Sequence, residues 1–166
     1  HIAHVSTARA VRLIREAKKE GLPVSGEVTP HHLILTDRAC ASWDTNHKMA
    51  PPLRTEVDRE ACLEGLADGT LDCIASDHAP HGCQDKEVPW PEAACGIIGL
   101  ETSVAATYSL VVKKKLSLHR WVESMTVSPA RILGIPHGTL QIGAAADVVL
   151  FDPKANWTYT AKSGES

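Results

Sequence analysis

Leu-Asp-Cys-Ile-Ala-Ser-Asp-His-Ala-Pro-His occupies residues 71–81, and its centre, Cys73–Ala75, is a short apolar run bounded by a glycine and a proline. Such a run is too short for a helix and is typical of a buried parallel strand. Where the run stops, Asp77, His78 and His81 follow within a few residues. A carboxylate and two imidazoles at the carboxyl end of a buried strand lie where an α/β barrel carries its chemistry. The stretch predicts part of an active site, in which Asp77 is the most important residue.

Residues 1–28 predict a βαβ unit. Residues 1–5 look like the end of a strand, and Ser6 is placed to cap a helix over residues 7–20. Apolar residues repeat at helical spacing in that helix, Gly21 follows as its stop, and residues 23–28 predict the next strand. This order implies a parallel sheet. A helix expected over residues 55–67, opened by Thr55, adds a second repeat before the strand that ends at Asp77.

The composition is that of an ordinary soluble domain, with 166 residues, 43% of them hydrophobic, and a net charge of −3. Mild acidity argues against a nucleic-acid partner, because binding the phosphate backbone needs a basic surface. No apolar run approaches the ~20 residues that cross a bilayer, so no membrane partner is expected. The five cysteines lack Cys-x-x-Cys spacing. This favours reduced thiols in a cytoplasmic protein over a disulfide framework or a zinc site built from Cys83 and Cys95.

The domain organisation changes near residue 137. The irregular residues 82–96 predict a binding loop, and helices are expected over residues 100–114, 117–124 and 128–134. Residues 138–151 then look like short strands joined by glycines, which need partner strands from elsewhere. We predict an α/β chain in which residues 1–136 are the C-terminal portion of a (β/α)8 TIM-type barrel. Residues 137–166 are expected to be strands of a small composite β domain, an incomplete β-sandwich.

His4 is the second candidate metal residue, because it too lies where a strand gives way to a helix. If both strands belong to one barrel, His4 and Asp77 converge on the same mouth. Their nitrogen and oxygen suit zinc at ~2.0–2.2 Å, so the pair predicts a metal-dependent hydrolase. Taken singly, each has an ordinary structural explanation, and the two histidines that accompany Asp77 favour function. The adjacent side chains of His31 and His32 cannot easily share one ion, which favours a structural role.

Five motifs occur in order along residues 1–150: His4-Val-Ser-Thr7, Glu27-Val-Thr-Pro-His-His-Leu33, Lys48-Met-x-Pro-Pro-Leu-Arg54, Asp77-His-Ala-Pro-His81 and Gly99-Leu-Glu-Thr102. In this combination the chain resembles the C-terminal half of dihydroorotases of the type found in bacteria and in multifunctional pyrimidine-synthesis enzymes, within the amidohydrolase superfamily. The first motif alone would also fit hydantoinases and allantoinases. The fourth motif, with Pro-Pro-Leu-Arg upstream, favours dihydroorotase.

The resemblance implies roles for five residues. His4 matches a histidine ligand of the second zinc, and Asp77 matches an aspartate that touches the metal and acts as general base. His81 matches a residue that binds the substrate carboxylate, and Gly96 matches a glycine whose backbone contacts the pyrimidine ring. Ala50 stands where the family commonly has a substrate-contacting Asn, and losing that amide would cost ~1–3 kcal/mol of binding. The implied reaction is the reversible cyclisation of N-carbamoyl-L-aspartate to dihydroorotate, with two Zn²⁺ in a complete active site.

The sequence holds only part of the family's metal motif. The His-x-His-x-Arg element, the bridging lysine or aspartate and another metal histidine are absent, and a full (β/α)8 barrel needs about 250 residues. We therefore expect a fragment, or a chain completed by another polypeptide, that alone neither holds two metals tightly nor turns over substrate. The implied partners are the small-molecule substrate and either a further copy of the chain or aspartate transcarbamoylase.

Two alternatives to an active dihydroorotase stay open. One is a catalytically silent dihydroorotase-like subunit that scaffolds aspartate transcarbamoylase. Relatives of that kind lose metal ligands, whereas His4 and Asp77 are both retained here. The other is a different cyclic amidohydrolase of the hydantoinase or allantoinase type, which a comparison of substrates would separate.

Overall fold

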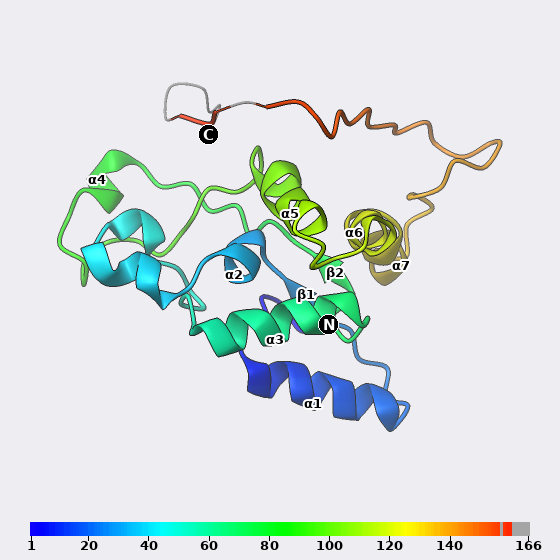
Figure 1. Ribbon diagram of the computed structural model, residues 1–166, viewed down its shortest axis with the longest axis horizontal. Coiled ribbons are helices and arrows are strands. Elements are labelled where there is room, and N and C mark those ends of the chain that lie inside the picture. The colour runs from blue at the N-terminus through cyan, green and yellow to red at the C-terminus, as the bar shows by residue number, and fades with distance from the viewer. Residues whose placement is uncertain (157, 161–166) are drawn as a thin grey trace.

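The computed structural model describes residues 1–156 and 158–160, and parallel strands lie at its centre (Figure 1). β1 (Glu27–Val28) pairs in parallel with β2 (Cys73–Ile74), with Glu27 opposite Cys73. On the other side of β1, Ile2 forms a parallel bridge with Gly26, and the Val5 amide donates to the Glu27 carbonyl at 2.9 Å. Three segments therefore run side by side in one direction, as the βαβ pattern predicts, and the chain is α/β.

Helices surround these strands. In the view of Figure 1, α1 and α3 lie below the strand pair, α5 lies above it, and α6 and α7 lie to its right. The helices are α1 (Ala8–Lys19), α2 (Pro30–Ile34), α3 (Glu56–Ala67), α4 (Cys83–Lys86), α5 (Ser103–Val112), α6 (Leu118–Met125) and α7 (Val127–Leu133), with two 3-10 turns, η1 (Asp37–Ser42) and η2 (Thr45–His47). None of the described helices combines the length and the apolar character that crossing a membrane requires.

The hydrophobic core fills the space between the helices and the strands. Its fully buried side chains come from α1, β1, α2, α3 and the residues before β2, and they include Val11, Val28, Leu33, Leu66 and Leu71. Burying a side chain of this size contributes ~1.5–3 kcal/mol. On the α6 side, Trp121 is buried and its indole N–H donates to Thr107 Oγ1 at 2.8 Å. The core thus fastens the helices to the strands and fixes which strands are neighbours.

Two predicted helix boundaries are confirmed by their caps. Thr55 Oγ1 accepts from the Asp58 amide at 3.4 Å and opens α3. Gly134 follows α7 with a φ of 66°, a left-handed conformation that glycine adopts without steric cost. The segment from His31 onward, which the sequence leaves open between helix and strand, begins as the short helix α2.

Two predicted caps are wrong. Thr7, not Ser6, caps α1, because Thr7 Oγ1 accepts from the Ala10 amide at 3.2 Å while Ser6 is buried at 7% exposure. The last helix begins before Ser128, which lies inside α7, and Thr126 occupies the cap position without a capping side-chain bond. In both places several hydroxyl residues stand close together, and packing decides which of them lies at the helix end.

The predicted short strands of residues 138–151 are not formed in the described residues. The backbone there is irregular, with a turn at residues 142–143, and it runs above the helices without strand pairing (Figure 1). Phe151 packs against Tyr108 and Trp121, with ring centroids 4.8 and 5.5 Å apart. A strand needs a hydrogen-bonding neighbour, and the described residues supply none to this segment. The assignment of residues 137–166 to a β-sandwich domain stays a prediction, and residues 157 and 161–166 lie outside the described part.

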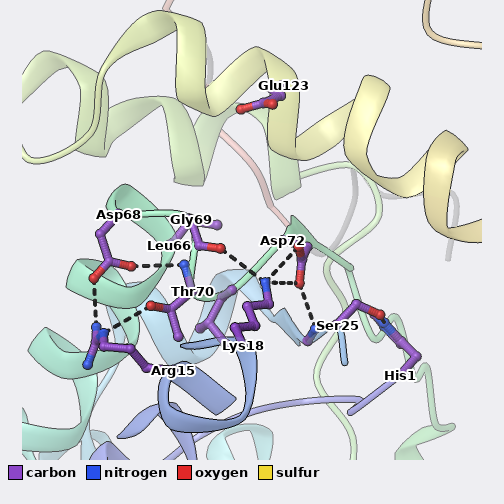
Figure 2. Close-up of polar contacts among 12 residues, drawn as sticks. His1, Arg15, Lys18, Ser25, Leu66, Asp68, Gly69, Thr70, Asp72 and Glu123 are labelled. Carbon is purple, nitrogen blue, oxygen red and sulfur yellow. Dashed lines mark hydrogen bonds and ion pairs between the residues drawn. The ribbon is translucent and has the colours of Figure 1, made fainter. Parts of the chain in front are cut away.

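A polar network ties α1 to the amino ends of β1 and β2 (Figure 2). Both oxygens of the Asp72 carboxylate lie 2.8 Å from Lys18 Nζ, and Oδ2 also accepts from the Gly26 amide at 2.9 Å. Lys18 donates further to the Gly69 carbonyl at 3.1 Å. The Asp72 side chain is only 26% exposed, so these charge-assisted bonds are better shielded than an ordinary surface pair.

We expect Asp72→Ala to lower the free energy of unfolding by about 1.5–3 kcal/mol, because it leaves the Gly26 amide unpaired and removes the anion beside Lys18. Urea unfolding measures this change. Asp68→Ala is the matched control, since Asp68 pairs with Arg15 and accepts from the Thr70 amide, but its side chain is 48% exposed, so water can replace it. An exposed pair contributes ~1 kcal/mol or less. An equal or larger loss in the control would contradict the expected role of Asp72.

Candidate metal and substrate site

The two residues that the sequence predicts as metal ligands lie together at the carboxyl ends of their strands. His4 Nε2 is 3.8 Å from Asp77 Oδ1, although 72 residues separate them in the chain. Both have left-handed backbones, with φ of 53° for His4 and 47° for Asp77. For residues other than glycine this conformation costs about 1–2 kcal/mol. Backbone strain of this kind is concentrated at functional sites, where the surrounding structure holds it in place.

The free atoms of this pair fit a bound cation. Asp77 Oδ2 is buried and has no hydrogen-bond partner in the described part of the chain. His4 Nδ1 is 3.1 Å from Glu27 Oε1, which leaves Nε2 to face Asp77. Two ligands at zinc distances in tetrahedral geometry are about 3.4 Å apart, close to the observed 3.8 Å. The donor set therefore suits zinc, but two ligands are fewer than the three or four that zinc sites use.

Two of the residues predicted to bind substrate, His81 and Gly96, lie in the irregular segment that follows β2. His81 Nε2 is 3.1 Å from the Cys95 carbonyl oxygen, and a Cβ added at Gly96 would lie within 2.8 Å of that same nitrogen. The structure thus brings His81 and Gly96 together. His81 also lines a cavity of about 460 Å³, with Trp43 and Lys86 among its other walls. Ala50 is exposed and lies in the segment before the two prolines, outside the lining of that cavity.

Two lysines hold this loop in shape. Lys48 Nζ donates to the carbonyls of Trp90 and Ala93, both at 2.6 Å. Lys86, 8% exposed, donates to the Gly96 carbonyl at 3.0 Å, while the Gly96 amide donates to the Lys48 carbonyl at 2.9 Å. Both backbone groups of Gly96 are therefore engaged within the loop. Burial lowers the pKa of Lys86, whose ammonium is enclosed by carbonyl oxygens.

Three further histidines differ in whether their ring nitrogens have hydrogen-bond partners. His32 confirms the predicted structural role, with Nδ1 2.7 Å from Thr29 Oγ1 and Nε2 3.1 Å from the Pro51 carbonyl. His78 orders the next loop, since its Nδ1 accepts from the backbone amides of Gly99 and Leu100, each at 3.1 Å. His31 differs from both, because its Nε2 is buried and has no partner within the described residues.

Glu27 is the site residue to which the sequence assigned no role. It lies in β1, between the strands that carry His4 and Asp77, and its carboxylate contacts His4. The available signal was a charged side chain inside an otherwise buried strand, which is rare unless the charge is paired. Lys86 is a second residue to which the sequence assigned no role. Nothing in the irregular sequence around it indicates that its ammonium group is buried.

The comparisons with known proteins agree with this arrangement. The family model described as "Amidohydrolase family" matches residues 1–166. The chain belongs to the amidohydrolase family. A dihydroorotase of Anaeromyxobacter dehalogenans (strain 2CP-C) is 58% identical over 160 residues, or 95% of this amidohydrolase chain. The match covers 37% of that protein's length, so the chain spans little more than a third of this relative. The resemblance to dihydroorotases is thereby confirmed.

Two solved structures share the fold of this amidohydrolase chain. The L-hydantoinase (dihydropyrimidinase) of Arthrobacter aurescens is 37% identical with a TM-score of 0.80, covering 87% of this chain and 33% of that one. The D-hydantoinase (dihydropyrimidinase) of Thermus sp. is 26% identical with a TM-score of 0.87, covering 97% of this chain and 37% of that one. In each case the likeness spans most of this chain and about a third of the neighbour.

We expect the unfolding free energy of this amidohydrolase chain to fall as the pH drops below 6.5. Burial, reinforced by His32 and His4, lowers the pKa of His31 from 6.5 to about 3. Below pH 6.5 His31 binds a proton in the unfolded chain but not in the folded chain. The free energy of unfolding therefore falls progressively between pH 6.5 and 3, by at most about 1.4 kcal/mol per pH unit. Urea unfolding at several pH values measures the slope.

His31→Gln removes the titrating group and should flatten that slope relative to the unsubstituted protein. The exposed His119 on α6 provides the matched control, because His119→Gln should leave the slope unchanged. Identical slopes in the His31→Gln variant and the unsubstituted protein would show that His31 is protonated equally in the folded and unfolded states.

Proposed function

We propose that these residues form the C-terminal portion of the (β/α)8 barrel of a zinc-dependent dihydroorotase. The reaction is the reversible cyclisation of N-carbamoyl-L-aspartate to dihydroorotate in pyrimidine synthesis. The observation that carries the proposal is the His4–Asp77 pair, held 3.8 Å apart at the carboxyl ends of the two parallel segments that flank β1. Curated dihydroorotases that are 48–58% identical over nearly the whole chain support the choice of substrate.

The chemistry divides between the ion and the residues of this chain. Zinc, when bound, lowers the pKa of a bound water to about 7 and polarises the amide carbonyl. His4 would hold the ion through Nε2, whose lone pair is free because Nδ1 faces Glu27. Asp77, whose Oδ2 has no hydrogen-bond partner, would take the proton of the attacking water and return it to the leaving nitrogen. The remaining zinc ligands would come from residues outside these 166.

The substrate carboxylate would bind at His81. Nε2 donates to the Cys95 carbonyl, so Nδ1 can donate to the substrate carboxylate only when the ring carries both protons. Gly96 lies against the His81 ring and leaves room for it. Ala50 offers no side-chain hydrogen bond, so binding would depend more heavily on His81 than in family members with an asparagine there.

A hydantoinase-type activity is the second candidate. It is favoured by Ala50, which departs from the dihydroorotase pattern, and by the structural likeness to hydantoinases. We place dihydroorotase first because the hydantoinases are 26–37% identical to this chain. The curated dihydroorotases reach 58% identity. We propose a cytoplasmic enzyme, and a further copy of the chain or aspartate transcarbamoylase as its protein partner.

We expect substitutions of His4 and Asp77 to act differently in the complete gene product that contains these residues. His4→Ala should lower the zinc content, measured by atomic emission, because a ligand is lost. Asp77→Asn should lower kcat by about 10²–10⁴, the range that general acid–base catalysis contributes. His119→Ala, an exposed histidine on α6, is the control and should change neither quantity.

The same preparations should be assayed with dihydroorotate, hydantoin and allantoin. Turnover of dihydroorotate alone supports the proposal, whereas preferential turnover of hydantoin or allantoin selects the second candidate. Folded, zinc-loaded protein that turns over none of the three would instead indicate a silent scaffold. Zinc content that is unaffected by His4→Ala would refute the proposed ligand.

Gly96→Ala should raise KM for dihydroorotate about 10- to 100-fold while changing kcat less. The new Cβ would lie against the Ala79 carbonyl and within 2.8 Å of His81 Nε2, so the ring must move. The range corresponds to the loss of a hydrogen bond to a charged group, about 1.5–3 kcal/mol. Gly82→Ala is the control in the same loop, because the atoms nearest to its Cβ belong to the end of the flexible Gln84 side chain, which can turn away. An unchanged KM in folded Gly96→Ala would argue against His81 as the carboxylate-binding residue.

A further inference from the structure

Glu27 lies at the centre of a row of polar side chains beneath the His4–Asp77 pair. Its Oε1 is 3.1 Å from His4 Nδ1 and its Oε2 is 3.0 Å from His1 Nε2. His1 Nδ1 lies in turn 2.8 Å from Ser25 Oγ. The Glu27 side chain is 15% exposed, and both of its oxygens are engaged. A carboxylate so enclosed is fixed in position by its partners, and it fixes them in return.

The contact determines which nitrogen of His4 is free. A carboxylate accepts a hydrogen bond, so the proton of a neutral His4 ring resides on Nδ1, facing Glu27, and the lone pair resides on Nε2. Nε2 is the atom that faces Asp77 Oδ1 at 3.8 Å. The left-handed backbone of His4 gives the ring an unusual starting direction, and the Glu27 contact sets its final orientation.

We propose that Glu27 is a positioning residue that holds His4 in the tautomer and orientation required of a zinc ligand. His1 fixes Glu27 in turn, through its contact with Oε2. The inference rests on the proposed zinc-dependent function, and it adds a group on β1 to the two ligands on the flanking segments. Carboxylates that bind the second nitrogen of a metal-bound histidine commonly act in this way, and their loss costs 10- to 100-fold in metal affinity.

The same residues invite a different interpretation, a separate metal site. The ligand atoms of His1, Glu27 and Cys73 lie within 4.8 Å of one another, the single such group of three among the described residues. Two observations disfavour a site there. Both Glu27 oxygens already pair with histidines, and burial raises the pKa of Cys73 to about 11, so its thiol is protonated at neutral pH. The cluster is better explained as support for His4.

Zinc affinity of the complete gene product, measured by chelator competition, tests the proposal. Glu27→Leu keeps the side-chain bulk but removes the acceptor, and it should weaken zinc binding about 10- to 100-fold. Glu27→Gln is the matched conservative variant. Its carbonyl can accept from His4 Nδ1 while its amide donates to a neutral His1, so affinity should stay close to that of the unsubstituted protein. The melting temperature of each metal-free variant separates positioning from general destabilisation.

The outcomes distinguish this inference from the proposed function. Lost zinc in His4→Ala with unchanged affinity in Glu27→Leu overturns the positioning role and leaves the function standing. No effect of His4→Ala refutes His4 as a zinc ligand, and the positioning role falls with it. Weakened zinc binding in Cys73→Ala would assign the cluster to metal binding and overturn the inference. Should Glu27→Leu fail to fold, Glu27→Asp replaces it, because its carboxylate ends one methylene short of His4 and should weaken binding in the same way.

Discussion

Parallel pairing on both sides of β1 is the constraint on which the rest of the structure depends. Ile2 is bridged to Gly26 and Glu27 lies opposite Cys73, so the segments that end at His4 and Asp77 flank β1 and run in the same direction. A shift of one residue would turn every side chain of a strand to its other face. Only the observed register puts Nε2 of His4 beside Asp77 while Nδ1 meets Glu27. The register of the strands therefore fixes both the packing of the core and the geometry of the candidate site.

The site combines unfavourable features that the surrounding fold must offset. His4 and Asp77 have left-handed backbones, and Asp77 Oδ2 and His31 Nε2 are buried without partners in the described residues. Each feature costs on the order of one to three kilocalories per mole. The fully buried Val28 and Leu33 lie within three residues of His31 in the chain, Leu71 precedes Asp77 by six, and each contributes a similar amount. A cation held by His4 Nε2 and Asp77 Oδ1 would offset part of the cost by stabilising the buried carboxylate.

The loop that carries His81 shows how an irregular segment becomes ordered. Lys48 and Lys86 direct their ammonium groups at backbone carbonyls between Trp90 and Gly96, so the loop's own polar groups hold it in place. Buried backbone carbonyls must be paired, and a lysine with three donors can satisfy several at once. The same bonds occupy Gly96 and leave the His81 ring lying against it. The order of the loop and the position of the His81 ring are therefore coupled through these two lysines.

The sequence by itself determined the βαβ order, the helices at Thr55 and Gly134, and the choice of His4 and Asp77, because apolar periodicity, capping residues and motif spacing are local signals. It did not determine which hydroxyl caps α1 or whether residues 138–151 find strand partners, since packing and distant neighbours decide both. Only the tertiary structure revealed Glu27 between His1 and His4, and the unpaired Nε2 of His31. Contacts of this kind join residues more than twenty positions apart or depend on burial, and no local pattern encodes them.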